Sequence, residues 1–136
     1  MTLLRFLLIL CCLGSLSTGF AEEKPRLHLE LNKLEQRGQH CAFYLVFQNQ
    51  LPTAFKKLQL ELVFFDQEGL IQRRLLLNAA PLAARKTMVK FFQLLNTPCS
   101  SVGRVLVNDI PECQPFGESC LDLLSVSSRS KVALIQ

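Results

Sequence analysis

The sequence predicts an all-β fold, an immunoglobulin-like antiparallel β-sandwich of about seven strands held by two disulfides. Three observations predict it: apolar residues alternate with polar ones at a period of two, turn signals recur about every ten residues, and an even number of cysteines follows an N-terminal targeting segment. The length of 136 residues leaves room for one domain. The hydrophobic content of 49% argues against intrinsic disorder.

The N-terminus has the pattern of an export signal. Arg5 precedes the uninterrupted apolar run 6–13, and small residues then lead to Ala21 at the end of a small-x-small cleavage motif. We expect cleavage after Ala21. An uncleaved anchor is the weaker interpretation, because a bilayer needs about 20 apolar residues. Lipid attachment at Cys11 or Cys12 is disfavoured, because large residues precede both cysteines.

Removal of residues 1–21 leaves a single domain, residues 22–136, with a net charge of +3, because one cation and no acid leave with the signal. Four cysteines remain in this domain. An even number of cysteines in a small exported domain is typical of structural disulfides. We therefore expect the protein in the periplasm or the extracellular medium, without stable insertion into a membrane after cleavage.

The first three expected strands differ in how many faces are apolar. Residues 27–31 have leucine at every second position, so one face is buried and the other wetted. Residues 41–48 are apolar on both faces, which is typical of a central strand. Residues 58–64 alternate again. Asp66 and Gly69 lie in a polar break that predicts a hairpin turn after this strand.

The later strands are shorter or less regular. We expect them at residues 70–77, 86–94, 102–108 and 121–126. In the second of these, both faces carry apolar residues, and we place Val89 and Phe91 on the buried face. The stretch 111–117 is expected to be a loop, and residues 132–135 a short apolar tail.

Strand geometry restricts how the four cysteines pair. Cys99 and Cys113 flank a strand whose ends lie about 20 Å apart, whereas the Cα atoms of a disulfide lie within about 7 Å. If the last two strands form a hairpin, Cys113 and Cys120 meet at its turn, which leaves Cys41 to pair with Cys99. A redox-active pair is disfavoured because the domain has no Cys-x-x-Cys motif. Free or metal-binding thiols are the remaining alternative.

The central part of the chain carries a series of fold motifs. Gln48-Asn49 and Phe55 are followed by L-x-L-E-L-V-F-F-D-x-E-G-L-I, then P-L-A-A-R-K-T and V-x-F-F. Residues 43–92 thereby resemble the FxLYD-type immunoglobulin-like modules of exported bacterial proteins. Arg85 stands where such modules usually have a turn glycine, so the local turn is expected to differ.

The whole mature chain also resembles a group of small secreted bacterial proteins with a late cysteine pair, through Cys99, the run V-L-V-N-D, Cys113 and Cys120. The resemblance implies an extracytoplasmic accessory or binding role. It implies turn roles for Asn49, Asp66 and Gly69 and carries no catalytic residue.

The residues show no recognisable catalytic motif: there is no Gly-x-Ser-x-Gly, His-Glu-x-x-His or Gly-rich phosphate loop. His28 lies on the polar face of its strand, and His40 precedes a cysteine expected in a disulfide. Together with Glu30 they lack the spacing of a metal-ligand set. We therefore expect a non-enzymatic protein, and we predict neither a cofactor nor a metal ion.

The sequence contains three basic doublets, which could meet in the folded sheet and attract acidic groups. They are Lys56–Lys57, Arg73–Arg74 and Arg85–Lys86. The simpler interpretation is that they mark turns and strand ends or protect edge strands against aggregation. Export makes nucleic acid an unsuitable partner.

An apolar outer face is the strongest functional signal. Tyr44 and Val46 alternate with buried residues of their strand, and so do Val63 and Phe65. A two-layer sandwich normally wets one face of each sheet, so these four side chains predict a contact surface for another protein of the bacterial envelope. Cover by the tail or by the connection 79–84 is the alternative explanation. The alternative function is a periplasmic carrier of a small ligand or of a metal held by the two histidines.

Overall fold

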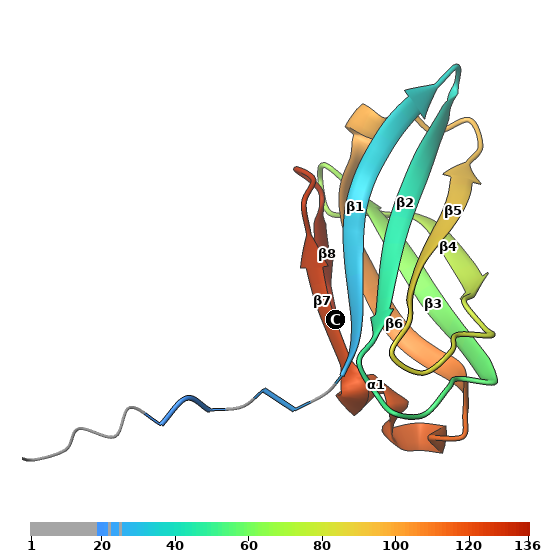
Figure 1. Ribbon diagram of the computed structural model, residues 1–136. Coiled ribbons are helices and arrows are strands. Elements are labelled where there is room, and N and C mark those ends of the chain that lie inside the picture. Colours follow the sequence, from blue (N-terminus) through green and yellow to red (C-terminus); the bar gives the residue numbers. More distant parts are fainter. Residues whose placement is uncertain (1–18, 22, 25) are drawn as a thin grey trace, which may run out of the picture.

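The computed structural model describes residues 19–21, 23–24 and 26–136. Most of the expected signal, residues 1–21, lies outside the described residues. The described part folds into two four-stranded sheets packed face to face, an all-β sandwich (Figure 1). The strands are β1 (Leu27–Arg37), β2 (His40–Asn49), β3 (Lys57–Asp66), β4 (Ile71–Asn78), β5 (Thr87–Leu94), β6 (Val102–Gln114), β7 (Leu124–Ser128) and β8 (Ala133–Ile135).

The strand order is β5-β2-β1-β7 in one sheet and β4-β3-β6-β8 in the other. The pairs β1–β2, β2–β5, β3–β4 and β3–β6 are antiparallel. β7 and β8 depart from the expected antiparallel arrangement, because they run parallel to β1 and β6 respectively. The short apolar tail expected at residues 132–135 thus contains β8, which extends the second sheet by one strand.

Three phenylalanines join the two sheets in the core. Phe43 of β2 stacks on Phe92 of β5, with ring centroids 5.1 Å apart. Phe64 of β3 meets Phe43 edge-on across the sandwich, with centroids 5.3 Å apart. Leucines at alternate positions of β1 and β3 are buried around them. Such offset and edge-to-face aromatic contacts add about 0.5–1.5 kcal/mol per pair beyond their buried area.

The orientation expected for β5 is wrong. Val89 and Phe91 are 59% and 46% exposed, and Met88 and Phe92 face the core. The reason is the register with β2, in which Phe43 lies opposite Phe92. Phe92 must point inward to join the aromatic cluster. Because alternate side chains of a strand point to opposite sides, Val89 and Phe91 then lie on the outer face.

The two disulfides join Cys41 to Cys99 and Cys113 to Cys120, which is the predicted pairing. The hairpin assumed in predicting it does not form, because β6 and β7 belong to different sheets. Instead β6 runs on to Gln114, through most of the expected loop. The short helices η2 (Gly117–Ser119) and α1 (Cys120–Leu123) then turn the chain back and bring the second pair together.

The expected turn between β3 and β4 is confirmed. The carboxylate of Asp66 accepts hydrogen bonds from the backbone N–H groups of Glu68 and Leu70, each at 2.9 Å. Gly69 has a φ of 84°, a conformation that L-residues rarely adopt. The turn packs against β6 at Gly103, where a Cβ atom would lie 2.4 Å from the carbonyl oxygen of Asp66.

Asn49 does more than end β2, because its buried side chain holds two loops together. Its amide nitrogen donates to the carbonyl oxygens of Thr53 and Ala83, both at 3.0 Å. Its side-chain oxygen accepts from the backbone N–H of Leu51 at 3.0 Å. One asparagine therefore fixes the β2–β3 connection against the β4–β5 connection.

Asn49→Ala should lower the free energy of unfolding by about 2–3 kcal/mol, because it removes three hydrogen bonds and leaves the buried backbone N–H of Leu51 unpaired. Urea denaturation followed by circular dichroism measures the change. Gln48→Ala, at the exposed neighbouring position, is the matched control and should change stability by less than about 0.5 kcal/mol. Equal effects of the two substitutions would contradict the proposed role of Asn49 in holding the two loops together.

Arg85, which stands at the expected glycine position, keeps the turn that a glycine would make. Its φ is 55°, in the left-handed region, where a residue with a Cβ is disfavoured by roughly 1–2 kcal/mol. The side chain is exposed. The resemblance therefore suggested a different turn, but the backbone conformation is of the kind that glycine favours.

Arg85→Gly should raise the free energy of unfolding by about 0.5–1 kcal/mol, since relief of the left-handed conformation outweighs the larger chain entropy of glycine. Asn96 also has a left-handed φ, 51°, and asparagine tolerates this region. Asn96→Gly should therefore give a smaller gain in the same thermal or urea unfolding experiment. A loss of stability in Arg85→Gly would show that the arginine contributes contacts of its own.

Within the described residues, the helices are single turns, and none is long and apolar enough to cross a membrane.

Candidate functional site

The four residues predicted to form one contact surface lie on two opposite faces. Tyr44 and Val46 belong to the outer face of β5-β2-β1-β7, and Val63 and Phe65 belong to the outer face of β4-β3-β6-β8. The reason is that β2 and β3, although consecutive in the chain, belong to different sheets. The predicted single surface is thus corrected to two separate ones.

On the first of these faces, Tyr44 and Val46 meet the two β5 residues that the sequence placed in the core. The register sets Tyr44 opposite Phe91 and Val46 opposite Val89. The rings of Tyr44 and Phe91 lie with their centroids 5.1 Å apart. The four side chains form a compact apolar block across two strands, which we call the β2–β5 patch.

Charged residues of β1 border the β2–β5 patch and touch its rings. The guanidinium carbon of Arg37 lies 5.3 Å from the centroid of Phe91, and Arg37 donates a hydrogen bond of 2.8 Å to the hydroxyl of Tyr44. The ammonium of Lys33 lies 5.5 Å from the centroid of Tyr44. Cation–π contacts of this kind contribute about 0.5–1 kcal/mol at exposed positions.

Glu35 holds both cations in place. Its carboxylate lies 2.8 Å from the ammonium of Lys33 and 3.1 Å from Nε of Arg37. The hydrogen bond from Lys33 and then that from Arg37 lower the pKa of Glu35 below its usual value. The tip of β1 therefore presents an ordered group of charges beside the two rings.

The opposite outer face is less open at the predicted residues. Val63 is only 5% exposed although it lies outside the core cluster, so neighbouring side chains of its own sheet cover it. The guanidinium of Arg104 lies 4.6 Å from the ring centroid of Phe65 and covers part of it. Phe65 lies opposite the exposed Ile71, so this face also carries accessible apolar area. The two predicted residues are themselves less available, because Val63 is buried and Arg104 lies over the ring of Phe65.

The edge strands β4 and β5 are protected against pairing with another strand. Arg73 of β4 lies opposite the buried Phe64, and Lys90 of β5 lies opposite the buried Leu45, so both cations are on the inward side of an edge strand. Inward-pointing charges on edge strands are a known device against strand addition. On this side of the sandwich, a sheet face is therefore better suited to recognition than an edge.

The two histidines do not come together. His28 lies near the start of β1 and His40 near the start of β2 beside Arg37, so about 30 Å of strand separates them. Nδ1 of His40 accepts a hydrogen bond from the backbone N–H of Asn96 at 3.0 Å. In the described part of the chain, no group of three or more histidine, cysteine or acidic side chains is placed to hold a metal ion.

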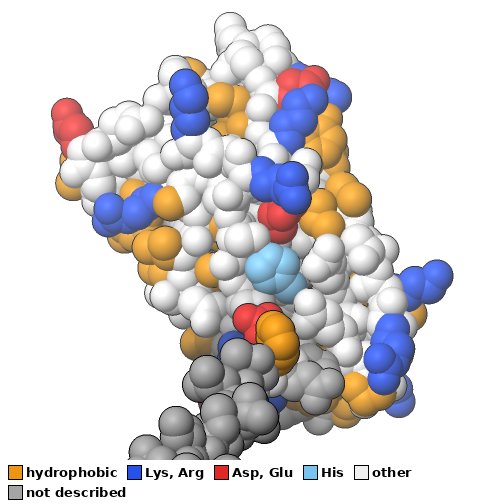
Figure 2. Space-filling model, turned by 60° about the vertical axis from the view of Figure 1, so that its left-hand side comes forward, with side chains coloured by type: hydrophobic (Ala, Val, Ile, Leu, Met, Phe, Trp, Pro, Cys, Tyr) orange, Lys and Arg blue, Asp and Glu red, His pale blue; other side chains and the backbone are white. Residues whose placement is uncertain are grey.

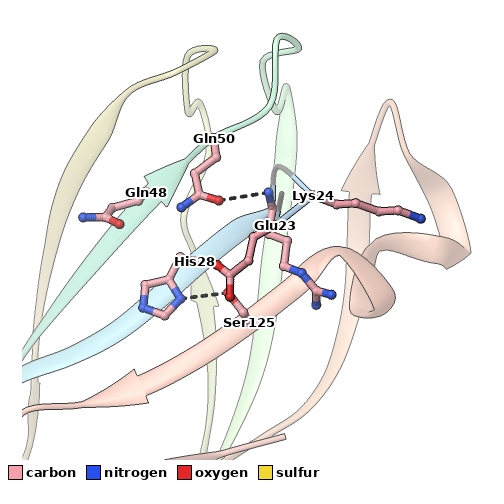
Figure 3. Close-up of a pocket in the computed structure, with 7 residues that line it drawn as sticks. Glu23, Lys24, His28, Gln48, Gln50 and Ser125 are labelled. Carbon is pink, nitrogen blue, oxygen red and sulfur yellow. Dashed lines mark hydrogen bonds between the residues drawn. The ribbon is translucent and has the colours of Figure 1, made fainter. Parts of the chain in front are cut away.

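A shallow polar pocket of about 500 Å³ surrounds His28 (Figure 3). Its lining residues are Glu23, Lys24, Arg26, His28, Gln48, Gln50 and Ser125. The imidazole is held by Ser125 and Ser127, whose hydroxyl oxygens lie 2.8 and 2.9 Å from its two ring nitrogens. A metal ion would have to displace one of these serines. On the face drawn in Figure 2, a histidine side chain is surrounded largely by backbone and by side chains that are neither hydrophobic nor charged.

No family model, curated protein or solved structure matches this chain. The assignment of a function therefore depends on the site alone.

Lys33→Met should raise the pKa of Glu35, because it removes the larger of the two hydrogen bonds that favour the carboxylate. Any stability that this group contributes is present above the pKa of an unfolded glutamate and is lost as the pH falls through the lower folded value. Carboxyl chemical shifts from an NMR titration measure the change. Arg26→Met, a remote cation, should leave the pKa of Glu35 unaltered, and a similar shift in both variants would contradict the network.

Proposed function

We propose that this protein is an exported, non-enzymatic binding module that engages another protein of the bacterial envelope through the β2–β5 patch. The observation that carries the proposal is the apolar block of the exposed Val89 and Phe91 with the half-buried Tyr44 and Val46, bordered by ordered charges. Apolar centres with a polar rim, enriched in tyrosine, phenylalanine and arginine, are typical of protein interfaces.

Order in the rim supports the same proposal. Arg37 is already held by Glu35 and by the hydroxyl of Tyr44 before any partner arrives. Immobilising a long side chain on binding costs about 0.5–1.5 kcal/mol, and this cost is reduced where the side chain is ordered beforehand. The patch therefore combines accessible apolar area with a rim that needs little rearrangement.

The two disulfides support export to the periplasm or the extracellular medium, since structural disulfides persist in oxidising compartments. We further assign the sandwich to the immunoglobulin type. The observation that supports this assignment is the division of the strands, with β1, β2 and β5 in one sheet and β4, β3 and β6 in the other. The parallel strands β7 and β8 are this chain's own departure from it.

Photo-cross-linking in the native compartment tests the proposed interface. A photoreactive amino acid at Val89 should capture a discrete protein partner. Adding Phe91→Asp should reduce the yield about tenfold or more, because an aromatic anchor of an interface typically contributes more than the 1.4 kcal/mol that a tenfold change requires.

The matched control is the substitution Ile135→Asp, which places the same charge on an exposed residue of β8 in the other sheet. It should leave capture from Val89 intact. If Val89 captures no partner, or if both aspartate variants reduce the yield equally, the β2–β5 patch is not the binding surface.

A further inference from the structure

The positive charge of this chain is concentrated in one segment. Between Glu68 and Asp109 lie 40 residues without a single aspartate or glutamate. The same segment contains six of the fifteen cations: Arg73, Arg74, Arg85, Lys86, Lys90 and Arg104. The remainder of the chain has more acids than cations, so the excess positive charge belongs to this segment.

The fold places most of these cations on one side of the sandwich. β4 and β5 are edge strands of different sheets, and Figure 1 shows them on the same side, away from β7 and β8. Arg73 confirms their proximity, because its guanidinium donates to the carbonyl oxygen of Leu95, directly after β5, at 3.2 Å. Arg73 and Lys90 lie within the two edge strands, and Arg85 and Lys86 directly precede β5.

These four cations are available to an external anion. In the part of the chain that the structure describes, none of them forms a salt bridge, whereas Arg74 pairs with Glu61. They are spread along the length of β5 and do not converge on a pocket. A partner with diffuse negative charge fits this distribution better than a compact anion does.

Exposed aliphatic side chains accompany the cations. Leu70 and Ile71 at the start of β4 are 62% and 65% exposed, and Leu95 is 59% exposed. The hydrogen bond from Arg73 to Leu95 joins the start of β4 to the residue that follows β5. We call Leu70, Ile71 and Leu95 together the aliphatic corner. Aliphatic side chains next to cations are the combination by which peripheral proteins bind the headgroup region of a membrane.

We propose that this side, the basic edge formed by Arg73, Arg85, Lys86 and Lys90 with Leu70, Ile71 and Leu95, binds the surface of anionic phospholipid membranes. The contact is peripheral: cations meet lipid phosphates, and the aliphatic corner enters the headgroup region. The spread of cations favours a lipid surface over an acidic protein, because a membrane supplies diffuse charge and requires no shape complementarity. The proposal is independent of the partner proposed for the β2–β5 patch.

Binding of the purified mature chain to vesicles tests the proposal without any protein partner. Vesicles with a third of phosphatidylglycerol in phosphatidylcholine should bind the chain at low salt, and vesicles of phosphatidylcholine alone should not. Because salt screens such attraction, 0.5 M NaCl should release most of the bound protein. Lys86→Gln with Lys90→Gln should weaken binding about tenfold or more.

The matched control is the double substitution Arg26→Gln with Lys131→Gln, which removes two cations outside the basic edge. It should weaken vesicle binding by about threefold at most. Ile71→Ser should weaken binding about fivefold, and Ile135→Ser on β8 should have little effect. Circular dichroism spectra of all variants establish that they are folded.

Three outcomes would overturn the proposal. The first is absence of binding to the anionic vesicles. The second is equal weakening by the two charge pairs, which would show attraction by net charge alone. The third is binding to polyglutamate but not to vesicles, which would assign the basic edge to an acidic protein. None of these outcomes bears on cross-linking at the β2–β5 patch.

Discussion

The packing of Phe43, Phe64 and Phe92 between the sheets is the constraint on which the surface of this protein depends. Side chains of a strand alternate between two faces. Once Phe43 and Phe92 are committed to the core, their neighbours Tyr44 and Phe91 must lie outside. The β2–β5 patch is therefore the outer counterpart of the aromatic core, and a one-residue shift between β2 and β5 would destroy both together.

The same alternation of side chains determines how the edge strands β4 and β5 are protected against the addition of another strand. Lys90 takes an inward position because it alternates with Val89 and Phe91, and it is tolerated there because β5 is an edge strand whose side chains reach solvent. Arg73 occupies the equivalent position on β4. Strand addition on this side would bury two cations, so a sheet face is better suited than this edge to the proposed recognition.

The sequence was sufficient for the fold class, because period-two alternation is a local rule. The reach of a disulfide excluded only the pair Cys99–Cys113, and the correct pairing of Cys113 with Cys120 was predicted from a hairpin that does not form. The sequence failed where tertiary contacts choose between two locally equivalent answers. β5 is apolar on both faces, and only its partner Phe43 decides that Phe92 is buried. Half of the β2–β5 patch was therefore placed in the core, and Val63 and Phe65 were grouped with residues of the other sheet.

β5 contributes to both proposed surfaces, and its alternation keeps them chemically distinct. Odd-numbered positions such as Phe91 present apolar area on the outer face, whereas Lys90 contributes charge at the edge. A substitution at an odd-numbered position of β5 changes the outer face, and a substitution of Lys90 changes the edge. In the two proposals, the eight residues of β5 contribute to a protein contact on one face and to a membrane contact at the edge, and both contacts depend on the aromatic core to hold the register of this strand.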